Sequence, residues 1–587
     1  MTPTGSRRIP SYPAPIRARL PLDEFRNIGE MVKRRAALYG DDPAYTVCLP
    51  NGITAAVSFA EADRMSDDLA TYFRTVLALE RGERVAVMLP NCLAYPLLAF
   101  GALKAGLVLT GINPLYTADE IAFQLRDSGA AVLVTLDLFG ARVARALEAV
   151  PVRAVIRTSV ADFFPPLRGG VVRAGLRVTG KTRGCPRQWT SLRHAVRAGR
   201  SARAGRPAVV ERSIAEVRPH DVALLQYTGG TTGVPKAAML THHNLLANAA
   251  QLAEIAGFYW DRRRDRMLTV LPLYHIFAFQ INCLTCFSLG CGTVLVPSPK
   301  PLSNLKPVFR KFQISYSTAV NTLLKLLLRE PWFRDQPPRS LRIVYAGGSA
   351  VEPSVIREWA EVVGGHVTQG YGLSEASPCV TFEPLHEAED ERGSDGRPRV
   401  RPADPDADGL GLPMPMTEIR VVTEDGRVAA VGEAGEIEVR GPQVMPGYWN
   451  QPDETAAVFH DGWLRTGDIG NLNDVGRVTI LDRKKDLISV SAFNVFPSQI
   501  EECVGALPAV AEAAIVGVPD EITGEAVVAF VVCPAGGVTE RDIREHCRAH
   551  LAAYKVPKRV LFRAELPKTA LGKTDRKVLR EEARRGA

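Results

Sequence analysis

The chain has 587 residues, of which 46% are apolar and 23% are charged, and its formal net charge is +8. This length is too great for a single hydrophobic core, so at least two domains are expected, and the composition excludes a generally disordered protein. Ten scattered cysteines favour a reducing compartment, and the first twenty residues lack the apolar run of a signal peptide, so we expect a cytoplasmic protein.

Short apolar strands alternate with helical patterns along the chain, which is typical of layered α/β domains. The predicted strands are 85–89, 131–136, 222–225, 341–345, 513–518 and 528–532.

Residues 161–212 form a basic segment, with twelve Lys and Arg against only Asp162 and Glu211. One interpretation is a solvated basic face. The other is attachment to an anionic membrane surface, from which a lipid substrate could arrive. No recognition motif for nucleic acid accompanies the charge, so nucleic acid is not expected as a partner.

The run LQYTGGTTGVPK at 225–236 follows one of the predicted strands. Its glycines allow a backbone to approach a ligand closely, and its hydroxyls and lysine suit phosphate oxygens. It is not a Walker A loop, because Ala237 follows the lysine, and it lacks the spaced glycines of dinucleotide folds. The alternative is a flexible turn. The candidate phosphate-binding residues are Thr228, Gly229, Gly230, Thr231, Thr232, Gly233 and Lys236.

Residues 267–299 carry no formal charge other than a possible one on His275. Polar residues, a proline and glycines interrupt this stretch, so we interpret it as strand, buried helix and strand in preference to a membrane span. Cys283 and Cys286 within it form a lone CxxC pair among apolar neighbours, and we expect buried thiols, not zinc ligands.

The run QGYGLSE at 369–375 combines three features that a nucleotide needs. Its glycines permit close approach, Tyr371 offers a flat face to a base, and Glu375 offers a hard oxygen ligand to Mg²⁺. The alternative is a glycine turn before a helix.

Two further motifs lie nearer the C-terminus. Asp468 in RTGDIG sits on a predicted tight turn, where a carboxylate can accept two hydrogen bonds from ribose hydroxyls. Lys573 in LPKTALGKTDRK follows a glycine in a predicted exposed turn, and alone it would be one more surface lysine.

Three segments divide the second half of the chain. Residues 385–409 are rich in charge, proline and glycine and are predicted to be a long exposed loop. Alternating short strands from 411 to 480 predict a β-rich subdomain. The charged run DRKKD at 482–486 then separates a smaller α/β unit.

Together these motifs resemble the adenylate-forming superfamily of acyl-CoA synthetases, luciferases and peptide-synthetase adenylation domains, over about residues 25–582. Segments outside the shared motifs, such as 112–130 and 554–562, are most similar to bacterial long-chain fatty-acid–CoA ligases. The resemblance implies a large adenylation domain, 1–481, and a small mobile catalytic domain, 482–587. It also implies ATP with Mg²⁺, a fatty acid and CoA as substrates.

The resemblance further implies roles for individual residues. Lys573, Lys236 and Glu375 are expected to be catalytic, and Thr228 and Glu375 to hold the metal. Asp468 and Arg483 are expected to bind the ribose, Asp482 to be the hinge between domains, and His275 to wall the acyl pocket. The remaining nucleotide-binding candidates are Gly347, Gly348, Ser349, Gln369, Gly370, Tyr371, Gly372 and Ser374.

Two positions depart from the family pattern: Ala237 and Ala492 each stand where glycine is usual. The resemblance places Ser491, Ala492 and Phe493 beside the CoA channel, so a methyl group there could narrow it. This leaves open an acyl-AMP ligase that loads a carrier protein. An oxygenase of luciferase type and a non-enzymatic lipid-binding protein are more distant alternatives.

Overall fold

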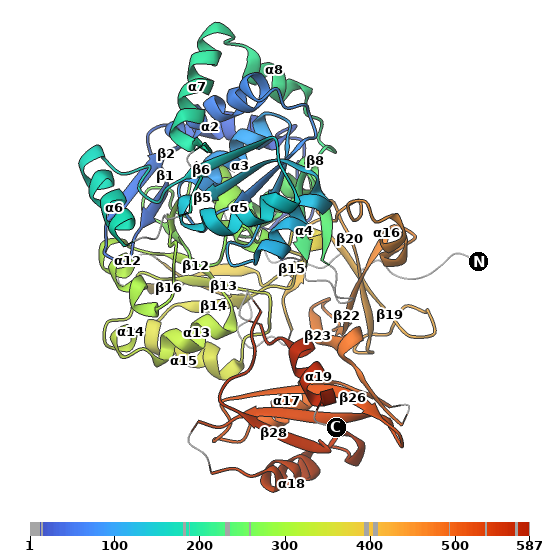
Figure 1. Cartoon of the computed structure of the whole chain (residues 1–587). Helices are drawn as coiled ribbons and strands as arrows, with labels where there is room; N and C mark the ends of the chain where they lie inside the picture. Colours follow the sequence, from blue (N-terminus) through green and yellow to red (C-terminus); the bar gives the residue numbers. More distant parts are fainter. Residues whose placement is uncertain are drawn as a thin grey trace.

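The computed structural model describes residues 12, 16–179, 184–186, 188–228, 235–256, 260–392, 398–402, 409–491, 493–534, 537–569 and 573–585. Two layered α/β units form the large N-terminal part, a β-rich unit packs beside them, and a small α/β unit closes the chain (Figure 1). The predicted α/β class is confirmed.

The first large sheet has seven strands, all parallel except the antiparallel β9. In spatial order they are β7 (Thr190–Ser191), β6 (Ala154–Thr158), β5 (Ala130–Leu136), β3 (Arg84–Met88), β4 (Val108–Gly111), β8 (Val222–Thr228) and β9 (Lys236–Thr241). The strands predicted at 85–89, 131–136 and 222–225 are therefore confirmed. The candidate phosphate-binding run joins β8 to β9, and Thr228 pairs with Lys236 at its two ends.

The second large sheet also has seven strands, of which only β2 is antiparallel to its neighbour. In spatial order they are β14 (His366–Gln369), β13 (Ile343–Ala346), β12 (Tyr316–Ala319), β10 (Arg266–Thr269), β11 (Gly292–Leu295), β1 (Pro43–Cys48) and β2 (Thr54–Ser58). The uncharged stretch 267–299 forms β10, buried helical turns over 276–289 and β11, as predicted. Cys283 and Cys286 are buried. Among the described residues, no helix is both long and apolar enough to span a bilayer.

Local sequence sets the start of several helices on these sheets. A serine or threonine with an acidic residue three positions later caps α2 (Phe59–Thr71) and α4 (Ala118–Ser128), and each pair exchanges two hydrogen bonds with the backbone. The apolar helix α3 (Ala94–Lys104) is buried along its whole length, and its terminal Lys104 is held by Asp63 and Asp67.

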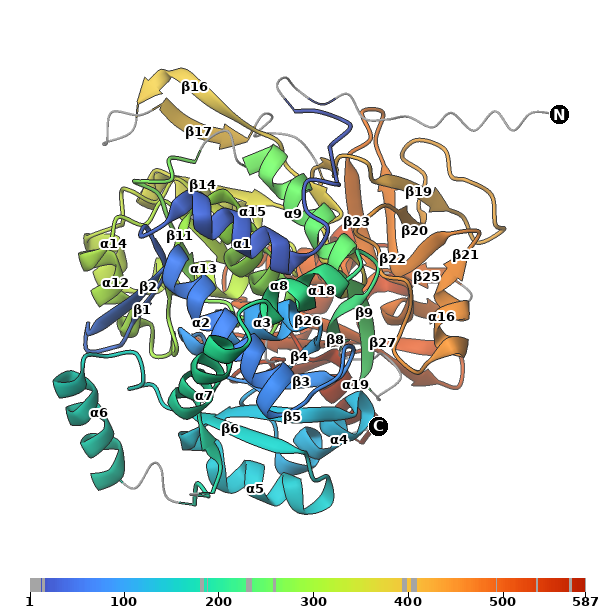
Figure 2. The same ribbon diagram turned by 90° about the horizontal axis from the view of Figure 1, so that it is seen from above.

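The prediction of an exposed loop at 385–409 is wrong for the residues that form a hairpin there. Residues Leu385–Arg392 (β16) and Pro398–Pro402 (β17) pair as an antiparallel hairpin, which projects from the edge of the large domain in Figure 2. Leu385 and Val400 are buried in the adjoining core and anchor it. A two-stranded antiparallel ribbon can face solvent, so charged residues do not prevent its strands from pairing. The polarity of this segment was therefore not evidence for a loop.

The β-rich subdomain predicted over 411–480 is confirmed. Its five-stranded sheet contains β19 (Glu418–Val422), β20 (Gly435–Arg440), β22 (Trp463–Leu472), β21 (Phe459–His460) and β23 (Val478–Arg483). The charged run ends this sheet in a short turn of helix, η7 (Lys484–Asp486).

The C-terminal unit is a five-stranded sheet covered by helices. Its strands are β25 (Phe493–Val495), β24 (Ile488–Val490), β27 (Gly524–Val532), β26 (Glu512–Asp520) and β28 (Arg559–Arg563), and its helices are α17 (Pro497–Gly505), α18 (Glu540–His550) and α19 (Arg576–Arg585). The alternating buried residues of β26 and β27 make its two small cores.

Candidate active site

The turn that carries Lys573 is pinned by backbone hydrogen bonds at its base. Thr569 N–H donates to the Lys573 carbonyl (2.7 Å), and Asp575 N–H donates to the Pro567 carbonyl (2.8 Å). These bonds fix the end of the turn just before α19, so the Lys573 side chain projects away from the small domain toward the large one.

The Lys573 side chain lies over Gly348 of the large domain. A Cβ placed on Gly348 would be 3.4 Å from Lys573 Cε, and Gly348 has φ = +82°, a conformation that favours glycine. Burial lowers the pKa of Lys573 to about 8, and the nearby charges of Arg483 and Lys485 act in the same direction. Arg483 and Lys485 are therefore near enough for their charges to act on Lys573, and Asp468, which pairs with Arg483, acts in the opposite direction.

His275, in the large domain, is near enough to Lys573 to be affected by the charge of the lysine. It precedes the short helix α10 (Ile276–Ala278), where its Nδ1 accepts a hydrogen bond from Phe277 N–H (3.3 Å). Burial, with a contribution from the Lys573 charge, lowers its pKa to about 4, so the imidazole is neutral at pH 7. A buried, neutral ring held by the Phe277 backbone is compatible with the expected wall of the acyl pocket.

Asp468 is the centre of a buried polar cluster. Arg483 Nε lies 3.0 Å from Asp468 Oδ1, and Tyr371 donates its hydroxyl proton to Oδ2 (2.6 Å). Asp468 lies within strand β22 and not on the predicted tight turn, and it meets Arg483 because the two residues pair between β22 and β23. Burial and the neighbouring carboxylate raise the pKa of Tyr371, so its phenol remains protonated.

The second group of expected residues meets where β8, β9 and the short helix η6 (Ser374–Ala376) pack together. Glu375 Oε1 accepts a hydrogen bond from Tyr448 O–H (2.8 Å), and Lys236 lies over the Tyr448 ring and pairs with Glu454. Thr228, the last residue of β8, lies opposite Lys236, the first residue of β9.

Tyr448 and Glu454 were not identified from the sequence. The segment that holds Tyr448 runs along β9: Met239 N–H donates to the Gly447 carbonyl (3.0 Å) and Trp449 N–H to that of Ala237 (2.8 Å). The only indication of Tyr448 in the sequence was its place in GPQVMPGYW at 441–449. This segment is similar to the corresponding segment of bacterial long-chain fatty-acid–CoA ligases.

The glycines around the expected base-binding segment are closely packed. A Cβ on Gly347 would lie 3.2 Å from the Phe277 ring, one on Gly370 would be 2.9 Å from the Thr381 carbonyl, and one on Gly372 would overlap the Pro378 carbonyl. Gln369 holds this segment by accepting a hydrogen bond from Val351 N–H (2.7 Å). Ser349 is exposed beside Gly348, and Ser374 opens η6.

Asp482 lies at the junction of the large and small domains and is buried. Its Oδ2 accepts a hydrogen bond from Ser498 N–H (2.9 Å) in the first turn of α17, and Ser498 Oγ donates to the Leu481 carbonyl. The end of β23 is thereby tied to the first helix of the small domain.

Several expected residues lie outside the described part of the chain. These are Gly229, Gly230, Thr231, Thr232 and Gly233 of the phosphate run and Ala492 of the CoA-channel loop. Of that loop, Ser491 is exposed with φ = +50°, and the backbone of Phe493 opens β25.

Comparison with known proteins supports a common architecture. Residues 32–449 match the family described as AMP-binding enzyme, and residues 499–573 match the AMP-binding enzyme C-terminal domain. The long-chain-fatty-acid–CoA ligase of Salmonella typhimurium is 39% identical over 577 residues, which is 98% of this chain and 97% of the relative.

Two solved structures of MatB from Rhodopseudomonas palustris are each 25% identical to this chain and cover 95% of it and 99% of their own chains. The TM-score is 0.75 for the ATP-bound form and 0.66 for the apo form. The arrangement seen here is thus closer to that of the ATP-bound form.

Proposed function

The chain belongs to the AMP-binding enzyme family, and we propose that it joins a long-chain fatty acid to coenzyme A through an acyl-AMP intermediate, with release of pyrophosphate and AMP. The fatty-acid substrate rests on the names of full-length relatives, including the Salmonella typhimurium ligase at 39% identity. The structural observation that carries the adenylation step is Lys573, which reaches from the small domain to Gly348 beside two further cations.

In the first half-reaction, a carboxylate oxygen of the fatty acid bonds to the α-phosphorus of ATP, and the bond to the bridging oxygen breaks to release pyrophosphate. Negative charge gathers on both the attacking and the leaving groups. The Lys573 ammonium, with Arg483 and Lys485 nearby, is placed to stabilise that charge in a water-poor site. The neutral His275 leaves the attacking carboxylate unprotonated.

The residues that would hold Mg²⁺ are Glu375 and Thr228, both hard oxygen ligands. Oε1 of Glu375 is engaged by Tyr448, while within the described part of the chain Oε2 has no hydrogen-bond partner, so the carboxylate suits a cation. When bound, the ion neutralises phosphate charge. We propose that Asp468 and Arg483 hold the ribose, and their ion pair, with the Tyr371 hydroxyl bonded to Asp468, supports this proposal.

In the second half-reaction, the CoA thiol loses its proton to solvent, its sulfur bonds to the acyl carbon, and the bond from that carbon to the AMP phosphate oxygen breaks, so that AMP leaves. For this step we propose that the small domain rotates about Asp482. Lys573 then leaves the site, and the loop of Ser491 replaces it. Holding the acyl carbonyl and the sulfur in one geometry supplies most of the rate.

The test of this function is pyrophosphate release across a panel of fatty acids of increasing chain length, with and without CoA. Release that requires a long-chain acid, with thioester formed when CoA is present, is the expected result. Turnover only with a carrier protein would support an acyl-AMP ligase instead. Absence of any acid-dependent ATP–pyrophosphate exchange would support a non-enzymatic lipid-binding protein.

The pKa of Lys573 predicts the pH dependence of adenylation. The ammonium form is the active one, and it is lost as the pH rises through about 8, well below the usual value for lysine. We expect kcat/KM for ATP to fall above about pH 8, by up to tenfold per pH unit, because this ratio reports the free enzyme. Lys573→Arg should remove this fall, since arginine stays charged; an unchanged profile in that variant would contradict the assignment.

A second prediction concerns whether CoA or a carrier protein accepts the acyl group. Ala492→Gly should accelerate acyl transfer to CoA by about tenfold and leave adenylation nearly unchanged, because one methyl group in a close-fitting channel costs roughly 1–3 kcal/mol. The measurement is single-turnover transfer from preformed acyl-AMP. Equal rates in the two proteins would mean that Ala492 does not obstruct CoA.

We also propose peripheral contact with an anionic bilayer, through α6 (Pro166–Val178) of the basic segment. This helix stands at the margin of the molecule in both Figure 1 and Figure 2. Leu167, Val171 and Val178 are 84%, 69% and 85% exposed, and their spacing puts them on one face of the helix. An exposed apolar face flanked by arginines is typical of helices that lie in the membrane interface.

Replacing Leu167, Val171 and Val178 together with serine should reduce sedimentation with phosphatidylglycerol vesicles several-fold, while activity on detergent-solubilised acid persists. Leu38→Ser is the matched control, since Leu38 is 60% exposed on α1 (Ile28–Tyr39). Equal sedimentation of all three proteins, or none by the unmodified protein, would remove this proposal.

A further inference from the structure

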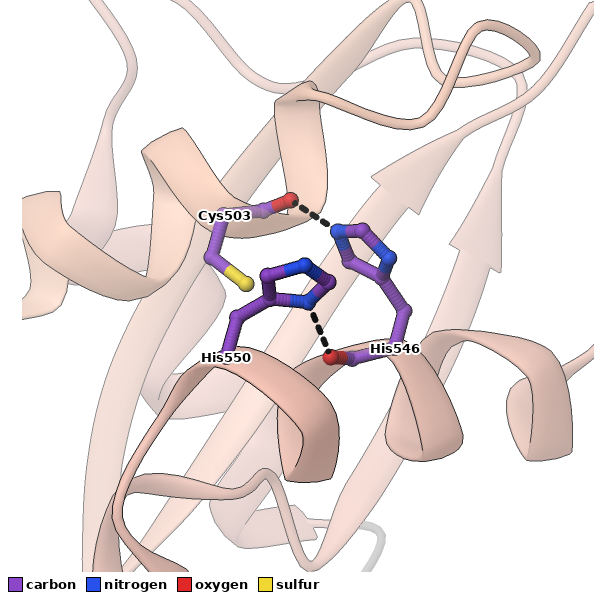
Figure 3. Close-up of side chains that lie close together, drawn as sticks. All are labelled: Cys503, His546 and His550. Atoms are coloured by element: carbon purple, nitrogen blue, oxygen red, sulfur yellow. Dashed lines mark hydrogen bonds between the residues drawn. The ribbon is translucent and has the colours of Figure 1, made fainter.

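A cysteine and two histidines meet on the small domain, outside the proposed active site. Cys503 is near the end of α17, and His546 and His550 occupy successive turns of α18, which packs against α17. Residues four apart share one face of a helix, so both imidazoles are directed toward α17, as Figure 3 shows. The Cys503 sulfur lies beside the two rings.

The ligand atoms are close enough for one ion. The Cys503 Sγ and one nitrogen of each imidazole all lie within 4.8 Å of one another. In a tetrahedral zinc site with bonds of about 2.0–2.3 Å, the ligand atoms are roughly 3.3–3.8 Å apart. Side-chain rotations would have to bring the three atoms closer, and His546 would bind the ion through Nδ1, or through Nε2 once that nitrogen releases the Cys503 carbonyl.

Hydrogen bonds around the cluster already orient the rings. His550 Nδ1 is 2.9 Å from the His546 carbonyl, and His546 Nε2 is 3.1 Å from the Cys503 carbonyl. The first bond leaves the other nitrogen of His550 as the one with a lone pair, which is how backbone carbonyls commonly orient metal-binding imidazoles. His550 is exposed and Cys503 half-buried, so an ion can enter from solvent.

We propose that Cys503, His546 and His550 form a binding site for a borderline-soft transition-metal ion, with Zn²⁺ as the best-fitting one. One thiolate and two imidazoles are ligands that zinc prefers, and water would complete the tetrahedron. On binding, Cys503 Sγ loses its proton to solvent and forms the metal–sulfur bond. The bound ion would link α17 to α18 across 43 residues of sequence.

The site is distant from the adenylation centre. In Figure 1, α18 lies on the side of the small domain that is turned away from the large domain. Metal binding should therefore stabilise the small domain without altering the adenylation chemistry at Lys573. This proposal does not depend on the proposed substrate, because its readouts are metal binding and thermal stability.

The test is titration of the chelator-treated, tag-free full chain with CoCl₂ under reducing conditions, followed by competition with ZnCl₂. The unmodified protein should bind one Co²⁺ with the absorption of a thiolate–cobalt bond, and ZnCl₂ should abolish that absorption. Zinc should also raise the melting temperature. The variants are Cys503→Ser and the exposed His550→Gln, each expected to bind at least tenfold more weakly, as loss of even an outer partner costs roughly 10–100-fold.

Two matched controls separate this site from incidental binding. Cys533→Ser removes another half-buried cysteine of the same domain, and His460→Gln removes an exposed histidine elsewhere. Both should bind cobalt as the unmodified protein does. If Cys503→Ser retains the thiolate absorption, if His550→Gln binds with undiminished affinity, or if the unmodified protein binds no cobalt, the proposal is wrong.

Discussion

Replacing Lys573 with alanine is expected to lower the rate of acyl-AMP formation by about 10²–10³-fold, the usual effect of removing one preorganised electrostatic group from a transition state. Lys573 is the small-domain cation that lies against Gly348, and partial burial with the nearby Arg483 and Lys485 charges lowers its pKa. The measurement is ATP–pyrophosphate exchange dependent on fatty acid. Thioester formation from supplied acyl-AMP should be largely preserved, because that step uses the rotated arrangement.

The matched control is Lys568→Ala. Lys568 belongs to the same C-terminal segment but pairs with Glu512 on the small domain. Its loss should leave both half-reactions near their original rates. Exchange within threefold of the unmodified protein in Lys573→Ala, or equal losses in both half-reactions, would contradict the role proposed for Lys573.

The second large effect is expected at Asp468. Asp468→Ala should weaken ATP binding by about 100-fold, because two hydrogen bonds from ribose hydroxyls to a carboxylate are each worth roughly 1.5 kcal/mol or more. The change also removes the partner of Arg483 and of the Tyr371 hydroxyl, so both would lose their present positions. Calorimetric titration with ATP is the measurement.

Asp468 is buried while the Arg483 side chain is 47% exposed, and Asp468→Ala also leaves the buried Tyr371 hydroxyl without its acceptor, so a second variant that keeps the shape is needed. Asp468→Asn keeps the shape and should still weaken ATP binding. Asp461→Ala, on the same hairpin but exposed, should leave affinity unchanged. Unaltered ATP affinity in both Asp468 variants would mean that the ribose lies elsewhere.

The sequence predicted those parts of the fold whose signal is local. Apolar runs such as 131–136 and 528–532 are strands because continuous burial in a sheet demands them. The hairpin at 385–402 was missed because its signal is not local. Its anchors, Leu385 and Val400, are two apolar residues in a charged segment, and their burial depends on a core built by distant strands.

The site residues also divide into those with a local signal in the sequence and those that only the folded chain brings together. Asp468 and Glu375 stand in short motifs whose residue types allow ribose and metal binding, and the family resemblance turned that possibility into a prediction. Tyr448 and Glu454 act on Glu375 and Lys236 only because the chain after Gly447 runs along β9, a pairing that no local pattern encodes. The cluster of Cys503, His546 and His550 was missed because its members are on two helices that meet only in the folded domain.

The junction at Asp482 has a consequence for how long each arrangement persists. Ser498 N–H donates to Asp482, and Ser498 Oγ donates to the carbonyl of Leu481 on the large-domain side. In the rotation proposed above, Leu481 separates from Ser498, so the bond between these two residues belongs to the present arrangement alone. At about 1 kcal/mol, this bond would favour the present arrangement over the rotated one by roughly fivefold.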